Sequence, residues 1–230
     1  MNFNNRLIIG MLLGIGVHVY STVIAGKIQI FCTAALIQSD FERREKEYSH
    51  SLEIIKSYGY EPYIVEAIFP KGPTFLHNYS QHICYSNVNN AALRNKGVNE
   101  ARSMTVGLQC FNFADDDMVV KLSGRYYFTS DYFVKYIENH PDVDACIISP
   151  NSYGFTPTAC FALRCKYFKE MLAGLDLERM ERNMINIEAE LVVYVQKLQR
   201  LGMKVAYLPR MEVAGSVYGN PGNAQTPWAM

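Results

Sequence analysis

The chain has 230 residues, of which 49% are hydrophobic and 19% charged, so it can bury a full core and lacks the composition of a disordered protein. Its 22 basic and 22 acidic residues give a formal net charge of zero, without a long run of either sign. The electrostatic footprint of a nucleic-acid-binding protein is therefore missing, whereas a small polar or anionic ligand remains compatible with this charge balance.

An apolar run precedes the part of the chain that should fold. One arginine comes before an uncharged stretch, residues 7–25, which ends in small and apolar residues and has the pattern of a cleaved secretory signal. A stretch of about 19 residues is also long enough to span a bilayer, and a buried N-terminal helix is the least favoured alternative. We expect residues 1–26 to be a signal peptide or a membrane anchor. The protein would then be exported, periplasmic or secreted, or held at a membrane through residues 7–25.

Six cysteines would suit disulfides in an exported protein, but their spacing does not suit a metal site. The sequence has no Cys-x-x-Cys pair, no His-Glu-x-x-His motif and no Cys/His cluster, so a zinc enzyme is not expected. Four cysteines lie in apolar, strand-like runs, where a free cysteine usually serves as a small hydrophobic residue: Cys32, Cys146, Cys160 and Cys165.

The first elements along the chain form a β-α-β unit. Residues 27–36 and 62–69 have the apolar pattern of strands. Between them, Ser39 and Glu42 have the spacing of a capping box at the start of a helix, and Gly59 ends that helix. The helix presents one apolar face, which consists of Phe41, Tyr48, Leu52 and Ile55. Two strands joined by a crossover helix predict a parallel sheet.

Strands and helices continue to alternate to the end of the folded part. The sequence predicts helices at 95–110, 130–139 and 183–201, the last being the longest, strands at 118–128, 144–150 and 204–209, and a strand at 158–168 that leads into a helix ending near Gly174. We expect residues 27–219 to form one α/β domain, a mostly parallel mixed sheet flanked by helices, followed by a flexible tail at 220–230. Residues 118–122 should lie in the middle of the sheet, because they are too apolar for an edge.

Three motifs in a fixed order suggest a family. "NKGVNEA" (95–101), "VVKLSGRYYF" (119–128) and "INIEAEL" (185–191) resemble sugar-nucleotide-dependent glycosyltransferases of the GT-A type, in particular bacterial and viral members with a Lys-x-Ser/Thr-Gly-Arg-Tyr strand. The resemblance covers roughly residues 27–219 and implies a GT-A-like, Rossmann-like fold. It also implies transfer of a sugar from a nucleotide-sugar donor to a glycan or other cell-surface acceptor. The alternative is a catalytically inactive GT-A-like binding protein, because a bacterial periplasm has no obvious supply of nucleotide sugars.

The resemblance implies where the nucleotide would bind. In such folds it lies across the carboxyl ends of the first strands, near Thr33, Ala34 and Glu66. Glu66 would contact the ribose or the base, unless it merely ends a strand beside solvent.

A second group of candidates lies where a loop enters a helix. There, free backbone N–H groups and the positive end of the helix would face phosphates, and Lys96 would add a charge. The candidates in this segment are Asn95, Lys96, Gly97, Asn99 and Glu100. The alternative is that Asn95 to Asn99 only cap the helix, which is the commoner use of such residues.

The segment from Asp115 to Asp117 raises the question of a metal. GT-A enzymes commonly end a central strand with an Asp-x-Asp pair that holds a divalent cation, but here the aspartates precede the strand. The far end of the strand carries four other candidates, Ser123, Gly124, Arg125 and Tyr126. We expect Arg125 to neutralise the diphosphate without a metal cofactor, with Mn or Mg as the alternative. The aspartates would then be a solvated loop, unless one of them forms a structural ion pair with Arg125.

Two carboxylates of the last long helix complete the candidates. Glu188 and Glu190 fall on opposite borders of its apolar stripe. Either is a candidate catalytic base or acceptor-orienting group, beside Arg125 as the third catalytic candidate. Carboxylates at such borders are more often simply solvated.

Overall fold

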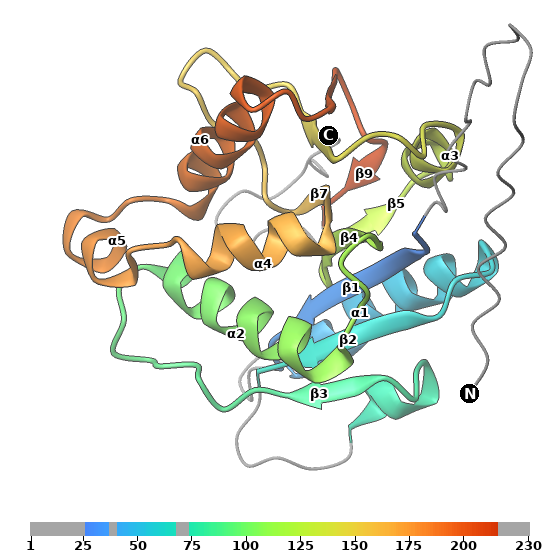
Figure 1. Cartoon of the computed structure of the whole chain (residues 1–230). Coiled ribbons are helices and arrows are strands. Elements are labelled where there is room, and N and C mark those ends of the chain that lie inside the picture. Colours follow the sequence, from blue (N-terminus) through green and yellow to red (C-terminus); the bar gives the residue numbers. More distant parts are fainter. Residues whose placement is uncertain (1–25, 37–40, 68–73, 216–230) are drawn as a thin grey trace, which may run out of the picture.

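The computed structural model describes residues 26–36, 41–67 and 74–215 (Figure 1). Three predictions fall outside these ranges: the signal or anchor in residues 1–25, the cap at Ser39 and the tail at 220–230. Among the residues that are described, no helix is both long enough and apolar enough to cross a membrane.

The main sheet of the described chain has seven strands in the order β3-β2-β1-β4-β7-β6-β8. Their bounds are Ile28–Ala34 for β1, Pro62–Glu66 for β2, Ile83–Tyr85 for β3, Met118–Ser123 for β4, Ala145–Ile148 for β6, Cys160–Arg164 for β7 and Val205–Leu208 for β8. All strands run in the same direction except β7, which is antiparallel to both of its neighbours. This mostly parallel mixed sheet confirms the predicted fold class, and β4 lies in its middle as expected.

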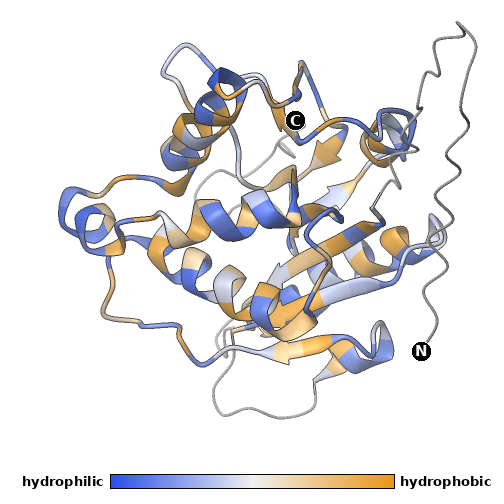
Figure 2. Cartoon of the chain, in the orientation of Figure 1, coloured by the Kyte–Doolittle hydropathy of each residue, from blue (hydrophilic) through white to orange (hydrophobic). Residues whose placement is uncertain are grey.

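Helices cover both faces of the sheet (Figure 1). One face packs against α1 (Phe41–Ser57) and α3 (Tyr132–Asn139), and the other against α2 (Lys96–Phe111), α4 (Cys165–Ala173), α5 (Leu177–Asn183) and α6 (Ile187–Arg200). A short 3-10 helix, η2 (Phe75–Asn78), precedes β3. Neighbouring strand residues alternate between the two cores, so Ile30 packs on the α1 side and Phe31 on the α2 side. The helices are therefore apolar mainly on the side toward the sheet (Figure 2).

The predicted strand at 118–128 is wrong in one respect, because the chain leaves the sheet in its middle. β4 ends at Ser123, and the N–H of Tyr126 donates to the carbonyl of Ser123 at 2.8 Å, which closes a turn. The following residues form β5 (Tyr127–Phe128), which pairs with β9 (Val213–Ala214) in a separate two-stranded sheet. Arg125 therefore lies in a turn between two sheets.

The predicted helix at 183–201 is also corrected. α6 begins only at Ile187, because Met184 adopts a left-handed conformation with φ 53° and ends α5, and Asn186 then precedes α6 in an extended conformation. Among the described helices, the longest is α1, with 17 residues.

All six cysteines are free thiols, so no disulfide supports the expectation drawn from an exported chain. Five of them are buried, and Cys110 is exposed. Burial raises the pKa of Cys32 and of Cys146 to about 12, which keeps both thiols protonated and unreactive. The buried thiols act as small core residues, as predicted for those in the strands.

Candidate functional site

A cavity of about 400 Å³ opens at the carboxyl ends of β1, β2 and β4. The chain passes from β1 outward to β2 and β3, and returns to place β4 on the other side of β1. The cavity therefore lies where the strand order reverses, which is the usual ligand position in an open α/β sheet. Its walls come from the ends of β1, β2 and β4, from α1, from the loop before α2 and from α2 itself.

The structure brings most of the predicted nucleotide-site residues together in this cavity. The predicted residues that line it are Thr33, Ala34, Lys96, Asn99, Glu100, Ser123, Gly124 and Arg125. Glu66, Asn95, Gly97 and Tyr126 lie next to lining residues in the sequence without lining the cavity themselves. The sequence analysis missed several further lining residues, among them Arg44 and Tyr48 of α1, of which Tyr48 packs against the end of β4.

The end of β4 is held tightly against β1 and α1. Thr33 and Ser123 are paired across the two strands, and the N–H of Gly124 donates to the carbonyl of Thr33 at 2.8 Å. A Cβ atom on Gly124 would lie 2.8 Å from the ring of Tyr48, closer than carbon atoms pack. Only glycine therefore allows the turn that presents Arg125 to approach α1 so closely.

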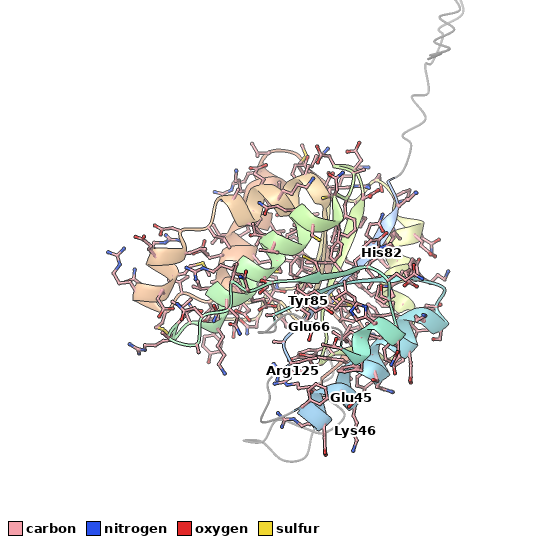
Figure 3. The ribbon with its side chains drawn as sticks, turned by 90° about the horizontal axis from the view of Figure 1, so that it is seen from below. Glu45, Lys46, Glu66, His82, Tyr85 and Arg125 are labelled. Atoms are coloured by element: carbon pink, nitrogen blue, oxygen red, sulfur yellow. The ribbon has the colours of Figure 1, made fainter. Side chains whose placement is uncertain are left out.

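Arg125 is half-buried on the cavity wall. Within the described ranges, its guanidinium group makes no hydrogen bond and no ion pair. In the view of Figure 3 it lies between Glu66 at the end of β2 and Glu45 on α1. The alternative of an ion pair with the aspartates before β4 is wrong, because they lie at the opposite end of that strand and have other partners. Arg125 thus offers a cationic fork to a ligand.

The expectation that the three aspartates form one solvated loop is wrong for Asp117. Asp115 and Asp116 are exposed and pair with Lys169 and Lys166, at 3.0 and 3.2 Å. Asp117 is buried instead: its carboxylate accepts the N–H of Lys27 at 2.9 Å and the side-chain amide of Gln29 at 3.0 Å. Asp117 therefore fastens the start of β1 to the start of β4.

The cavity wall is more cationic than anionic. Arg44, Lys96 and Arg125 carry positive charges, of which that of Arg44 is paired with the buried Glu47 at 3.4 Å. Glu100 is the acidic residue among the described lining residues, and it is paired with Lys121. The amides of Asn89, Asn90 and Asn99 add polar groups, and Asn99 binds the backbone of Asn90 in both directions at 2.9 Å. A wall of this composition attracts an anionic ligand with polar substituents.

Asn95 and Gly97 serve the helix rather than the cavity. The side-chain oxygen of Asn95 accepts the N–H of Gly97 at 3.0 Å, and its amide donates to the carbonyls of Met180 and Ile185. The capping alternative therefore describes Asn95, and its N-cap places Lys96 and Asn99 toward the cavity.

Glu66 ends β2 fully buried, so the alternative of an acidic residue beside solvent is wrong. The hydroxyl of Thr74 donates to one carboxylate oxygen at 3.0 Å, and the other oxygen has no partner among the described residues. Burial raises the pKa of Glu66 to about 7, against the smaller effect of the Thr74 hydrogen bond. Figure 3 shows Glu66 close to Tyr85 of β3. Glu66 directly precedes Ala67, which lines the cavity.

Lys121 is the functional candidate that sequence reasoning missed. It lies in the apolar strand β4, its side chain is fully buried, and it forms an ion pair with Glu100. It also donates to the hydroxyl of Ser123 at 2.7 Å and to the carbonyl of Thr158 at 2.6 Å. A lysine inside an otherwise apolar strand, two residues before a serine, was the available signal.

The two predicted catalytic carboxylates of α6 do not line the cavity. Glu188 accepts a hydrogen bond from the hydroxyl of Thr158 at 3.1 Å, and Thr158 in turn binds Lys121 through its carbonyl. Glu190 pairs with Arg179 of α5 at 2.6 Å. Glu188 is therefore linked to the cavity only through intervening residues, and Glu190 faces α5. Among the described residues, no group of three or more histidine, cysteine or acidic side chains is placed to hold a metal ion.

No protein-family model and no curated protein matches this sequence. Solved structures with a similar fold include a protein described as a nucleotide-diphospho-sugar transferase from Desulfovibrio desulfuricans, with 14% identity, 80% of each chain covered and a TM-score of 0.49. A cytidylyltransferase from Leptospira borgpetersenii has 11% identity over 81% of this chain and 77% of that one, with a TM-score of 0.49. A glycosyltransferase involved in glycosylation of the major capsid of PBCV-1 has 10% identity over 78% and 81%, with a TM-score of 0.45. The fold class rests on the sheet and its helical layers, which stand without these likenesses.

Proposed function

We propose that the protein binds a nucleotide sugar in the cavity and transfers its sugar to a glycan or other cell-surface acceptor. The observation that carries the proposal is the guanidinium group of Arg125, which has no partner among the described residues and lies at the switch point of the sheet on a cationic wall. A diphosphate offers oxygens that match the guanidinium fork. The ordered motifs that resemble GT-A glycosyltransferases support a sugar nucleotide over other anions.

In this proposal the cationic residues act on the leaving group. Cleavage of the bond to the sugar leaves negative charge on the diphosphate, and the cavity-lining residues Arg125, Lys96 and Arg44 would stabilise it. Arg125 would supply the positive charge that a divalent cation supplies in Asp-x-Asp members of the resembling family. We propose that Asp115 to Asp117 hold no essential metal, because they lie at the other end of β4. We also propose that residues 7–25 direct export of the domain or anchor it in a membrane.

A second candidate function is nucleotide-sugar binding without transfer. It is favoured by the placement of the predicted catalytic carboxylates: Glu188 and Glu190 do not line the cavity, and Glu190 is paired with Arg179. A general base must lie within hydrogen-bond reach of the proton it takes, and neither carboxylate lies at the cavity wall.

A thermal-shift screen with uridine and guanosine diphosphates and their sugars tests both functions. Ligand at about 100 times its Kd should raise the free energy of unfolding by roughly 2.7 kcal/mol. Stabilisation followed by release of nucleoside diphosphate in the presence of glycan acceptors supports transfer. Stabilisation without release favours the binding protein, and the absence of any shift contradicts both.

A further inference from the structure

The buried lysine of β4 is not explained by its place in an apolar strand. The side chain of Lys121 is fully buried, where an ammonium ion loses its hydration. The hydrogen bonds of its ammonium group are nevertheless satisfied, because the group donates to the carboxylate of Glu100, the hydroxyl of Ser123 and the carbonyl of Thr158. Ser123 ends β4, and Thr158 lies just before β7, so the ammonium group is fixed relative to the centre of the sheet.

Glu100 is the partner that reaches the cavity. Its side chain is 26% exposed and lines the cavity wall from the start of α2. One carboxylate oxygen, Oε1, binds Lys121, and the same oxygen lies 3.5 Å from the hydroxyl of Ser123. In the described part of the chain, the second oxygen, Oε2, has no hydrogen-bond partner. The structure thus fixes one oxygen of this carboxylate and leaves the other for a ligand.

Charge decides what that oxygen can bind. A free carboxylate would repel a diphosphate held by Arg44, Lys96 and Arg125, but the pair of Glu100 with Lys121 is neutral as a unit. The unused lone pairs of Glu100 still accept hydrogen bonds, and the hydroxyl groups of a sugar ring are the donors that a nucleotide sugar offers.

We propose that Lys121 is a positioning residue that holds the Glu100 carboxylate at the cavity wall, where its second oxygen accepts a hydrogen bond from a sugar hydroxyl. The inference rests on the proposed binding of a nucleotide sugar and assigns the part of it that Glu100 contacts. Ribose and the transferred sugar share this chemistry, and the choice of probes below distinguishes them.

The experiment measures Kd by calorimetry for UDP, 2′-deoxy-UDP, 3′-deoxy-UDP and UDP-glucose, and for the matching guanosine series. The variants are Glu100→Gln, Lys121→Met and the double variant, in which no buried charge is left without its partner. The matched control is Lys197→Met with Glu170→Gln, which removes an exposed ion pair of 2.7 Å between α6 and α4.

We expect the wild type and the control to bind the probe that carries the contacted hydroxyl more tightly than the matching probe that lacks it. The two Kd values should differ by about 10- to 100-fold, the size of a hydrogen bond to a charged group. A preference for UDP over a deoxy form identifies the ribose, and a preference for UDP-glucose over UDP identifies the transferred sugar. The double variant and Glu100→Gln should lose that preference while retaining their affinity for the probe that lacks the hydroxyl. Lys121→Met should reduce the preference.

A purely structural ion pair would affect all probes alike. If the double variant keeps the full preference, or loses affinity equally for every probe, the positioning role is overturned while nucleotide binding by the wild type stands. If the wild type binds neither series, the proposed function and this inference fail together.

Discussion

Arg125 is the residue on which the proposed donor site depends. Its guanidinium group has no partner among the described residues, so its removal should cost little stability and act on the ligand alone. We expect Arg125→Ala to weaken nucleotide-sugar binding by about 1.5 to 3 kcal/mol, the range for hydrogen bonds to a charged group. Lysine should restore only part of this, because a point charge cannot replace the bidentate fork.

Calorimetric titration measures both effects, with Arg200→Ala on the exposed end of α6 as the control. Unchanged binding by Arg125→Ala would contradict the role of Arg125 on which the proposed function depends.

The aspartates before β4 should separate into two kinds in mutants. Replacing Asp115 and Asp116 by Asn should leave stability within about 0.5 kcal/mol and binding unchanged, because exposed ion pairs contribute little. Asp117→Asn should lower the free energy of unfolding by about 1 to 3 kcal/mol, since its buried carboxylate accepts partly buried hydrogen bonds from Lys27 and Gln29. Urea unfolding measures the stability difference.

The same variants test the metal question when binding is measured with and without a chelator. If chelation abolishes binding and Asp115→Asn with Asp116→Asn is equally inactive, a metal held by the aspartates replaces the role proposed for Arg125.

Glu66 should make stability depend on pH. Burial raises its pKa from 4.5 to about 7, so between these values the folded protein binds more protons at this site than the unfolded chain. The stabilisation from protonated Glu66 is complete below pH 4.5 and is lost as the pH rises through 7. Relative to Glu66→Gln, the wild type should therefore become less stable across this window. Urea unfolding of both proteins from pH 5 to 8 measures the difference, and a constant difference would contradict the raised pKa.

The contact between α2 and β1 depends on one glycine. A Cβ atom on Gly107 would lie 2.6 Å from the ring of Phe31 and 3.0 Å from Val65. Alanine gains about 1 kcal/mol of helix propensity, but overpacking at such distances costs about 3 kcal/mol, so Gly107→Ala should destabilise by about 2 kcal/mol. Gln109→Ala on the exposed face of the same helix is the control. Chemical denaturation measures the stability of both variants relative to the wild type. A stabilised Gly107→Ala would contradict the prediction and show that the core can rearrange around the added methyl group.

Sequence patterns predicted the main elements because their signals are local. The strands at 28–34 and 118–123 are predominantly apolar, and α1 follows from one apolar face and Gly59, which has φ 84°. The errors arose where the chain breaks without such a signal. Met184 adopts a left-handed conformation that its residue type does not predict, and β5 leaves the main sheet to pair with a strand 86 residues later in the chain.

The site was predictable as far as sheet geometry reaches. The carboxyl ends of parallel strands meet at one edge, so Thr33 and Ser123 were expected to lie together, and they are paired across β1 and β4. The contribution of Arg44 depends on how α1 packs, and the pairing of Lys121 with Glu100 depends on tertiary contacts between β4 and α2. Neither is encoded in a local pattern.

The whole molecule is built around β1 and β4, which neighbour each other at the centre of the sheet and are covered by helices on both faces. Their amides should exchange with solvent most slowly, because their exposure requires opening of the entire sheet. The amides of the edge strands β3 and β8 and of the small sheet of β5 and β9 should exchange earlier. Hydrogen exchange followed by mass spectrometry measures this order, and fast exchange in β4 would contradict its central place.

The pairing of β5 with β9 has a consequence for synthesis on the ribosome. Arg125 lies between β4, which the earlier strands hold, and β5, whose partner is residues 213–214. When residues 26–126 have emerged, every element that lines the cavity has been made. The Arg125 turn can then be held by β1, through the carbonyl of Thr33, and by α1, through the hydroxyl of Ser51, which donates to the carbonyl of Tyr126 at 2.6 Å. The strand partner of β5 follows only at residues 213–214, so the walls of the proposed donor site are synthesised before the strands that complete both sheets.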